Sequence, residues 1–282
     1  MRARLTPAPA PARAQQQTGS QEAAIETRTA LVGGGSAGIG RAAAEQLARA
    51  GLQVVISGRR ADALASAAAD LRERTGVQID TLVNDVSDPA GAAAAIDAMI
   101  GRHGSLDVLV LNAGGPPPGR ILEAGDEQWQ AAFELLLLGP LRLARLALPR
   151  MAERGFGRVI FVTSAVVRQP QPDLATSVVL RSAVTAAAKL LSREFAAEGV
   201  TVNCVAPGAT ATERRTQILG NRARVLGSSL EALDAQDAAA VPAGRAGRPE
   251  EIGAAVAFLA GQAAGYVNGT VLTVDGGRTE TI

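Results

Sequence analysis

The segment that most constrains this chain is a glycine-rich loop, Gly33 to Gly40, with the sequence GGGSAGIG. A short apolar strand is expected before it, over residues 27–32, and a helix after it, over residues 41–50, with Gly51 closing that helix. In this order, the glycines let the backbone approach a pyrophosphate, and the helix N-terminus points free N–H groups at it. The alternative is a purely structural turn. The expected ligand contacts are Gly34, Ser36, Gly38, Ile39 and Gly40.

The second strand, expected over residues 53–57, is followed by a pair of arginines. In a dinucleotide-binding fold, the tip of this strand meets the adenosine ribose, where an acidic residue binds a free 2′-hydroxyl and an arginine fits a 2′-phosphate. Gly58 stands in the usual acidic place, and Arg59 and Arg60 follow it. The sequence therefore favours NADP(H) over NAD(H) as the cofactor. Alternatively, the two arginines are solvated residues that open a helix.

Strands and helices continue to alternate along the chain, with helices expected over 61–75 and 89–103 and strands over 78–83 and 106–111. This alternation predicts an α/β fold: a single Rossmann-type domain with a doubly wound parallel sheet and helices on both faces. Its ligand is expected at the carboxyl ends of the strands. Further cofactor contacts are expected at two of these ends, Asp85 and Val86, and Asn112, Ala113 and Gly114.

Charge and composition exclude several classes of partner. The net charge of +1 gives no field for nucleic acid or a membrane surface, and no apolar run approaches the ~18 residues that span a bilayer. The single cysteine suits a reducing compartment, so we expect a cytoplasmic protein, without a metal site. Residues 1–24 are rich in Pro, Ala and Gln, which predicts a disordered extension without a secretory signal, or a partner-binding tail, before a domain over 25–282.

Motifs from Gly34 onward resemble those of the short-chain dehydrogenase/reductase family, in its single-domain form. They are GGSAGIG at Gly34–Gly40, Asp85-Val86, Asn112-Ala113-Gly114, Val202-Asn203, Pro207-Gly208 with Thr212, GRAGRPEEIG at Gly244–Gly253 and NGTVLTVDGG at Asn268–Gly277. The resemblance implies NAD(P)(H)-dependent hydride transfer with a small carbonyl or alcohol substrate. It also implies a lid over about 212–243 and a homo-oligomer, either a tetramer or a dimer. It assigns further cofactor contacts to Pro207, Gly208, Thr210 and Thr212.

In the family that the chain resembles, a serine polarises the substrate carbonyl and a tyrosine moves the proton. A lysine one helical turn later lowers the pKa of that tyrosine, and an asparagine holds a water relay. Ser164 falls on the serine position, but the tyrosine and lysine positions fall on Ser177 and Arg181, and the asparagine position on Leu136. The chain is therefore expected to be an atypical member, with SxxxR in place of YxxxK.

The only lysine and the only tyrosine of the chain, Lys189 and Tyr266, lie outside these positions and cannot substitute in place. Ser177 and Arg181 share one face of an expected helix. Arg181 can hydrogen-bond the nicotinamide-ribose hydroxyls and stabilise a developing oxyanion, but a guanidinium does not shuttle protons. Asp173 is the only nearby carboxyl group that could move a proton, although an aspartate before a helix is more often a cap.

The expected lid contains the charged run Glu213, Arg214 and Arg215, which either meets an acidic substrate or forms a solvated helix face. The leading hypothesis is an NADP(H)-dependent oxidoreductase that works by positioning and polarisation, with the proton coming from solvent, substrate or Asp173. One alternative is a non-redox dehydratase, isomerase or cyclase on the same fold. The other is a catalytically silent NADP-binding protein. The sequence does not identify the substrate.

Overall fold

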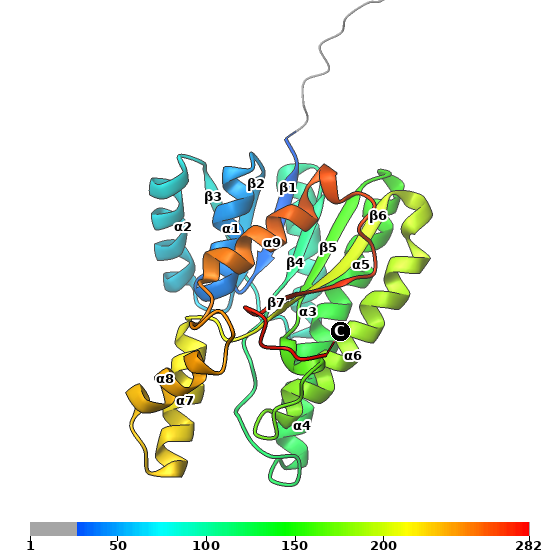
Figure 1. Cartoon of the computed structure of the whole chain (residues 1–282). Helices are drawn as coiled ribbons and strands as arrows, with labels where there is room; N and C mark the ends of the chain where they lie inside the picture. The colour runs from blue at the N-terminus through cyan, green and yellow to red at the C-terminus, as the bar shows by residue number, and fades with distance from the viewer. Residues whose placement is uncertain (1–26, 282) are drawn as a thin grey trace, which may run out of the picture.

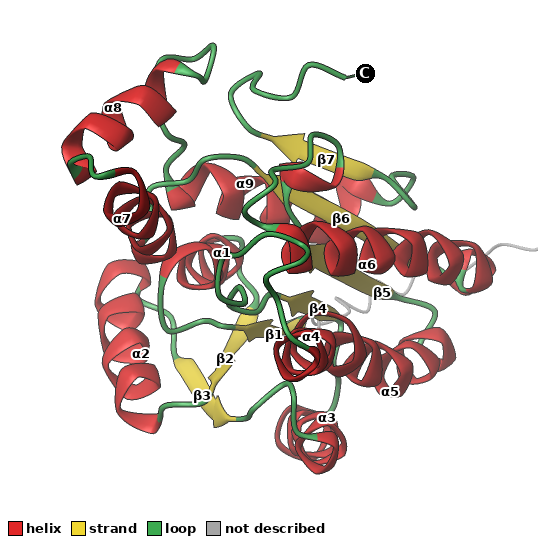
Figure 2. Ribbon diagram, turned by 90° about the horizontal axis from the view of Figure 1, so that it is seen from below, coloured by secondary structure: helices red, strands yellow, loops and turns green. Residues whose placement is uncertain are grey.

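The computed structural model describes residues 27–281, so the extension expected over residues 1–24 lies outside the described residues. A seven-stranded, wholly parallel sheet forms the centre of the fold, and the predicted doubly wound α/β architecture is confirmed (Figures 1 and 2). The strands lie in the order β3 (Ile79–Val83), β2 (Gln53–Gly58), β1 (Thr29–Gly33), β4 (Val108–Leu111), β5 (Gly157–Val162), β6 (Val200–Pro207) and β7 (Val271–Val274).

Helices cover both faces of this sheet, as Figure 2 shows. One face is covered by α1 (Gly38–Arg49), α2 (Ala61–Thr75) and α9 (Pro249–Ala260). The other is covered by α3 (Pro89–His103), α5 (Gly139–Glu153) and α6 (Ala175–Glu194). The helix α4 (Asp126–Phe133) runs into a π-helical turn, Glu134–Leu138, before α5. The helices α7 (Glu213–Leu226) and α8 (Leu230–Ala239) lie beyond the carboxyl ends of the strands (Figure 1).

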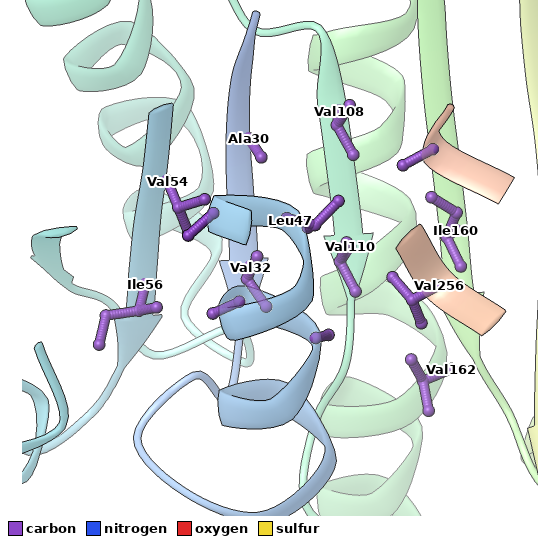
Figure 3. Close-up of a cluster of buried hydrophobic side chains, with 14 of the residues drawn as sticks. Ala30, Val32, Leu47, Val54, Ile56, Val108, Val110, Ile160, Val162 and Val256 are labelled. Atoms are coloured by element: carbon purple, nitrogen blue, oxygen red, sulfur yellow. The ribbon is translucent and has the colours of Figure 1, made fainter. Parts of the chain in front are cut away.

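The central strands are apolar on both faces because each face packs against helices. Along β1, Ala30 and Val32 belong to the core beneath α1, whereas Leu31 between them belongs to the core on the opposite face. Figure 3 shows the first of these cores, in which Leu47 of α1 and Val256 of α9 meet alternate residues of four strands. Small branched side chains suffice here because the helices approach the sheet closely.

The strand order places a topological switch point between β1 and β4. From β1 the chain proceeds to β2 and β3 on one side, and from β4 it proceeds to β5, β6 and β7 on the other. The connections therefore diverge at the carboxyl ends of β1 and β4, and a crevice for a ligand opens between them. Gly33 is the last residue of β1 and Asn112 directly follows β4, so the sequence motifs and the crevice coincide.

The bounds of β1, β2, β3, β4 and α1 differ from the sequence-based expectation by one to three residues, and two of these differences have a local cause. The helix α1 begins at Gly38 and not at residue 41, since glycine is tolerated in a first turn whose N–H groups need no intrahelical partner. The strand β4 begins at Val108 and not at residue 106, because the Asp107 carboxylate is buried and accepts the Thr29 amide at 2.8 Å in place of a ladder hydrogen bond. Among the described helices, none combines the length and apolarity needed to cross a membrane.

Candidate functional site

The glycine-rich loop follows β1 and is shaped by contacts that leave no room for side chains. The Asn112 amide donates from Nδ2 to the Gly33 carbonyl at 3.1 Å, which ties the loop to the end of β4. A Cβ atom at Gly34, where φ is +61°, would lie 2.7 Å from that same Nδ2. A Cβ atom at Gly40 would overlap the carbonyl oxygen of Gly34. The loop therefore exposes its backbone, and a ligand can approach closely.

The N-terminus of α1 opens into the same space. Its N-cap residue, Ala37, makes no side-chain capping hydrogen bond, so the N–H groups of the first turn remain available to a ligand. Thr212 lies opposite, where a Cβ atom at Gly38 would be 3.3 Å from its methyl group. An uncapped helix N-terminus beside a bare backbone loop has the donors and the room that a diphosphate requires. The residues present therefore fit a dinucleotide.

A cleft of about 860 Å³ joins this loop to the carboxyl ends of β4, β5 and β6. Most of the predicted contacts line it: Gly34, Gly38, Ile39, Arg59, Asn112, Ala113, Gly114, Pro207, Gly208, Thr210 and Thr212. All the predicted catalytic positions line it as well: Ser164, Asp173, Ser177 and Arg181. The fold thus brings together side chains from segments that are far apart in the sequence.

Five predicted contacts do not line the cleft: Ser36, Gly40, Arg60, Asp85 and Val86. The Asp85 carboxylate is already used in a local turn, where Oδ1 accepts the Ser87 hydroxyl at 2.6 Å and the Ser87 amide at 3.0 Å. The hydroxyl hydrogen bond is the main reason that the pKa of Asp85 is lowered, and the charge of Arg59 adds to it. Arg60 is exposed and precedes α2, so only Arg59 of the pair reaches the cleft.

Ser177 and Arg181 lie one turn apart on α6 and are hydrogen-bonded to each other. Arg181 donates from Nε to the Ser177 hydroxyl oxygen at 3.2 Å, and from Nη1 to the Val162 carbonyl at 2.7 Å. Burial lowers the pKa of Arg181 to about 10, and the nearby charge of Arg214 contributes to this shift. Arg181 therefore remains a cation at neutral pH, and it is fixed to the end of β5.

Ser164 follows β5 and faces the cleft from a short 3₁₀ turn, where its hydroxyl oxygen accepts the Val166 amide at 3.4 Å. The position that the family resemblance gives to an asparagine holds Leu136, in the π-helical turn. Leu136 is buried and packs with Ala132 and Leu180. Although π-turns are frequent at functional sites, this one presents an apolar side chain that can hold no water relay.

Asp173 forms a bidentate ion pair across the mouth of the cleft. Its two carboxylate oxygens accept Nε and Nη2 of Arg222, on α7, at 2.6 and 2.9 Å. Gln171 accepts Arg222 as well, at 2.8 Å. The alternative role of Asp173 as a helix cap is not observed, since α6 begins after Leu174 without a side-chain capping hydrogen bond. The ion pair joins the loop before α6 to α7. The helices α7 and α8, whose residues line one side of the cleft, form its roof.

The charged run Glu213, Arg214 and Arg215, expected from the sequence, lines the cleft, whereas Arg222, Asp237 and Arg278 line it without any sequence signal. Asp237 on α8 accepts Nε of Arg215 at 3.0 Å and Nη1 of Arg278, from the C-terminal segment, at 2.6 Å. With Arg222, these residues hold the roof in place through pairs that are distant in sequence. Arg214 is a different case, because it donates to the Pro116 carbonyl and has no carboxylate partner among the described residues.

Lys189 and Tyr266 do not reach the cleft, as expected from the sequence. The Lys189 ammonium donates to the Gly269 carbonyl at 3.1 Å, and Tyr266 is fully exposed. Within residues 27–281, no three His, Cys, Asp or Glu side chains are grouped so that they could hold a metal ion.

Comparisons with known proteins agree with this geometry. The family model described as Enoyl-(Acyl carrier protein) reductase matches residues 34–279. The NADPH-dependent reductase BacG of Bacillus subtilis is 31% identical over 259 residues, which cover 92% of this chain and 100% of BacG. The 3-oxoacyl-(acyl-carrier-protein) reductase FabG of Escherichia coli is 34% identical over 254 residues, covering 90% of this chain and 98% of FabG.

A solved structure gives the same result at the level of the fold. Actinorhodin polyketide ketoreductase with NADPH superposes with a TM-score of 0.87 at 33% identity, covering 90% of this chain and 98% of that one. Family model, relatives and structure each extend over nearly the whole of the described sheet and its helices. The chain therefore belongs to the short-chain dehydrogenase/reductase family of oxidoreductases.

Proposed function

We propose that the protein transfers a hydride between NADP(H) and a small carbonyl or alcohol substrate, without a tyrosine–lysine pair. The observation that carries the proposal is the 3.2 Å hydrogen bond between Arg181 and Ser177, in the cleft that Ser164 also lines. A cation and two hydroxyl groups that line one cleft can bind a carbonyl oxygen and stabilise the negative charge that develops on it.

The cofactor would be held by backbone more than by side chains. When bound, its nicotinamide ring supplies or accepts the hydride. The loop at Gly34 and the N-terminus of α1 would take the diphosphate, and Thr212 would close over it from the opposite wall. Arg59 is the residue that would favour NADP(H) over NAD(H), because an arginine at the tip of β2 suits a 2′-phosphate. The names of BacG and of the ketoreductase structure, both of which include NADPH, support this choice.

Two side chains, Ser164 and Arg181, would together polarise the substrate carbonyl. The Ser164 hydroxyl donates to the carbonyl oxygen, and Arg181 stabilises the oxyanion as the hydride adds to the carbonyl carbon. Arg181 does not release a proton near neutral pH, since its pKa is about 10. Water then supplies the proton that converts the oxyanion into the alcohol. For Asp173 we propose a positioning role in place of proton transfer, because both its oxygens accept Arg222.

One observation favours a second candidate function. Among the described residues that line the cleft, there is no tyrosine, histidine, lysine or cysteine. A positioned acid or base contributes roughly 10²- to 10⁴-fold to such reactions, and the cleft lacks four of the side chains that usually supply it. This favours either a nucleotide-binding protein without turnover or a non-redox enzyme, such as a dehydratase, isomerase or cyclase, that uses Arg181 and Ser164 for electrostatic stabilisation alone.

A cofactor titration followed by a single-turnover experiment separates these candidates. NADPH binding is measured by fluorescence, and oxidation is then followed by nicotinamide absorbance with a panel of aldehydes and ketones. The proposal predicts binding and oxidation, whereas binding without oxidation across the panel supports the second candidate. The double variant Ser177→Tyr with Arg181→Lys should raise turnover by about tenfold or more. No gain would indicate a cleft adapted to another reaction.

A further inference from the structure

The cleft carries more positive charge than its own carboxylates balance. Six arginines line it against three acidic residues; these are Arg59, Arg181, Arg214, Arg215, Arg222 and Arg278 on one side and Asp173, Glu213 and Asp237 on the other. Arg222 is paired with Asp173, and both Arg215 and Arg278 are paired with Asp237. Three arginines remain without a carboxylate partner among the described residues: Arg59, Arg181 and Arg214.

Two of these arginines lie away from the expected 2′-phosphate contact. Arg59 follows β2, whereas Arg181 is anchored to Val162 at the end of β5, with β1 and β4 between those two strands. Arg214 lies over the segment that follows β4, where a Cβ atom at Gly115 would be 2.9 Å from its Nη2. Arg181 and Arg214 therefore belong to the half of the cleft that contains Ser164.

Both guanidinium groups retain unused donors. A guanidinium carries five N–H groups. Arg181 uses its Nε towards Ser177 and its Nη1 towards Val162, and no described residue accepts from its Nη2. Arg214 donates only to the Pro116 carbonyl, from Nη2. Both side chains are half-buried, and burial lowers the pKa of each. Two partly desolvated cations that line one cleft and retain unused donors favour binding of an anion.

We propose that Arg181 and Arg214 bind a carboxylate of the substrate, so that the protein acts on small keto acids or hydroxy acids. This inference rests on the proposed hydride transfer and adds the substrate class to it. The cofactor phosphates are the other anions that could occupy the cleft, but the loop at Gly34 and Arg59 already provide donors for them. A neutral ketone would leave both cations unpaired. We therefore expect the protein to recognise its substrate partly through the substrate's negative charge.

The test uses the full chain and compares acids with their uncharged analogues. A panel of short α-, β- and γ-keto acids and their methyl esters is titrated calorimetrically, with and without saturating NADPH. We expect at least one acid to bind about tenfold more tightly than its ester. Arg214→Gln should reduce this ratio below about threefold while the NADPH Kd changes by less than about twofold. Arg214→Lys, which retains the charge, should keep part of the preference.

The control variant is Arg224→Gln, which removes an exposed arginine of the same helix that does not line the cleft, and it should keep the full ratio. Equal binding of acids and esters by the wild-type protein overturns the proposal. It is also overturned if Arg214→Gln weakens NADPH about tenfold and leaves the acid-to-ester ratio intact, since the anion would then be a cofactor phosphate. If the protein prefers acids but does not oxidise NADPH, the proposed hydride transfer is wrong and the carboxylate site stands. If it oxidises NADPH with neutral ketones and shows no preference for acids, the carboxylate site is wrong and the hydride transfer stands.

Discussion

The Arg222 guanidinium holds both carboxylate oxygens of Asp173, at 2.6 and 2.9 Å, and thereby joins α7 to the loop before α6. Both side chains are about two-thirds buried, so the pair is better shielded from solvent than a surface ion pair. It spans one side of the cleft, while Asp237 and its two arginines hold the other side. The two helices α7 and α8 are therefore held over the cleft by ion pairs at two points.

If the Asp173–Arg222 ion pair only holds α7 in place, removing either side chain should change the kinetics in the same way. We expect Asp173→Asn and Arg222→Gln each to raise the KM of the substrate by about threefold to tenfold, with kcat within about twofold of wild type. The double variant should be no worse than either single variant, which a double-mutant cycle of steady-state kinetics measures. A loss of kcat of about a hundredfold in Asp173→Asn alone would instead identify Asp173 as the proton donor.

Arg59 and Arg60 are neighbours in sequence, but we assign only Arg59 to the 2′-phosphate of the cofactor. Arg59 lines the cleft and Arg60 does not, although both are exposed. Arg59→Ala should weaken NADPH about tenfold and NADH by less than about twofold, because it removes a charge-assisted contact that only the phosphorylated cofactor makes. Arg60→Ala is the matched control and should alter neither affinity. Fluorescence titration of both nucleotides measures this, and equal losses for NADPH and NADH in Arg59→Ala would contradict the assignment.

The glycine loop makes a prediction about stability. Gly40→Ala places a Cβ atom against the carbonyl oxygen of Gly34, which is backbone and not the flexible end of a side chain, so the chain has to shift. The free energy of unfolding should fall by about 2 kcal/mol, and NADPH affinity should fall with it. Gly101→Ala, on the exposed side of α3 with nothing within 4 Å, should be neutral or stabilising by up to about 1 kcal/mol. Urea unfolding of both variants checks the contrast, and an unchanged Gly40→Ala would show that the loop is looser than described.

The pH dependence follows from Arg181. Burial, together with the charge of Arg214, lowers the pKa of Arg181 to about 10. The cation should be fully present between pH ~6 and ~9, so kcat/KM for reduction should be level there and fall as the pH rises through about 10. Arg181→Gln should be slower but should lack this fall. A midpoint below about pH 8 in the wild-type profile would mean that another group moves the proton.

The lowered pKa of Arg181 has the opposite effect on the free energy of unfolding: activity falls above about pH 10, whereas stability rises. The unfolded chain retains the Arg181 proton to higher pH than the folded chain, so it binds more protons above about pH 10. The contribution of Arg181 to the free energy of unfolding therefore rises with pH in that range. Loss of activity above pH 10 is thus expected from deprotonation in the cleft and not from this group's effect on folding.

The parts of this protein that were predicted from sequence are those whose signals are local. Gly34 and Asn112 could be placed because each follows an apolar strand of a repeating β–α pattern, and parallel strands bring such ends to one edge. Asp85 also lies at an expected strand end, but its carboxylate accepts a hydrogen bond from the Ser87 hydroxyl and does not line the cleft. Sequence spacing does not show that a neighbouring side chain competes with the cofactor for this carboxylate.

A lid over about residues 212–243 was expected from the family resemblance, but the individual contacts that hold α7 and α8 in place could not be predicted in the same way. Arg222 lies 49 residues from Asp173, and Arg214 lies 98 residues from Pro116, with no periodicity that relates them. Arginines on an amphipathic helix look alike in sequence whether they face solvent or a cleft. Their roles depend on how α7 packs over the strand ends, which is a property of the tertiary structure alone.

The most direct test of the central claim is isotope transfer from NADPH deuterated at the transferable position of the nicotinamide. The wild-type protein is incubated with this cofactor and the panel of carbonyl compounds, and the products are analysed by mass spectrometry. Hydride transfer in the cleft of Arg181 and Ser177 predicts an alcohol that contains one deuterium on the former carbonyl carbon, with the yield reduced in Arg181→Gln. Bound NADPH with no deuterated product from any member of the panel would contradict the claim.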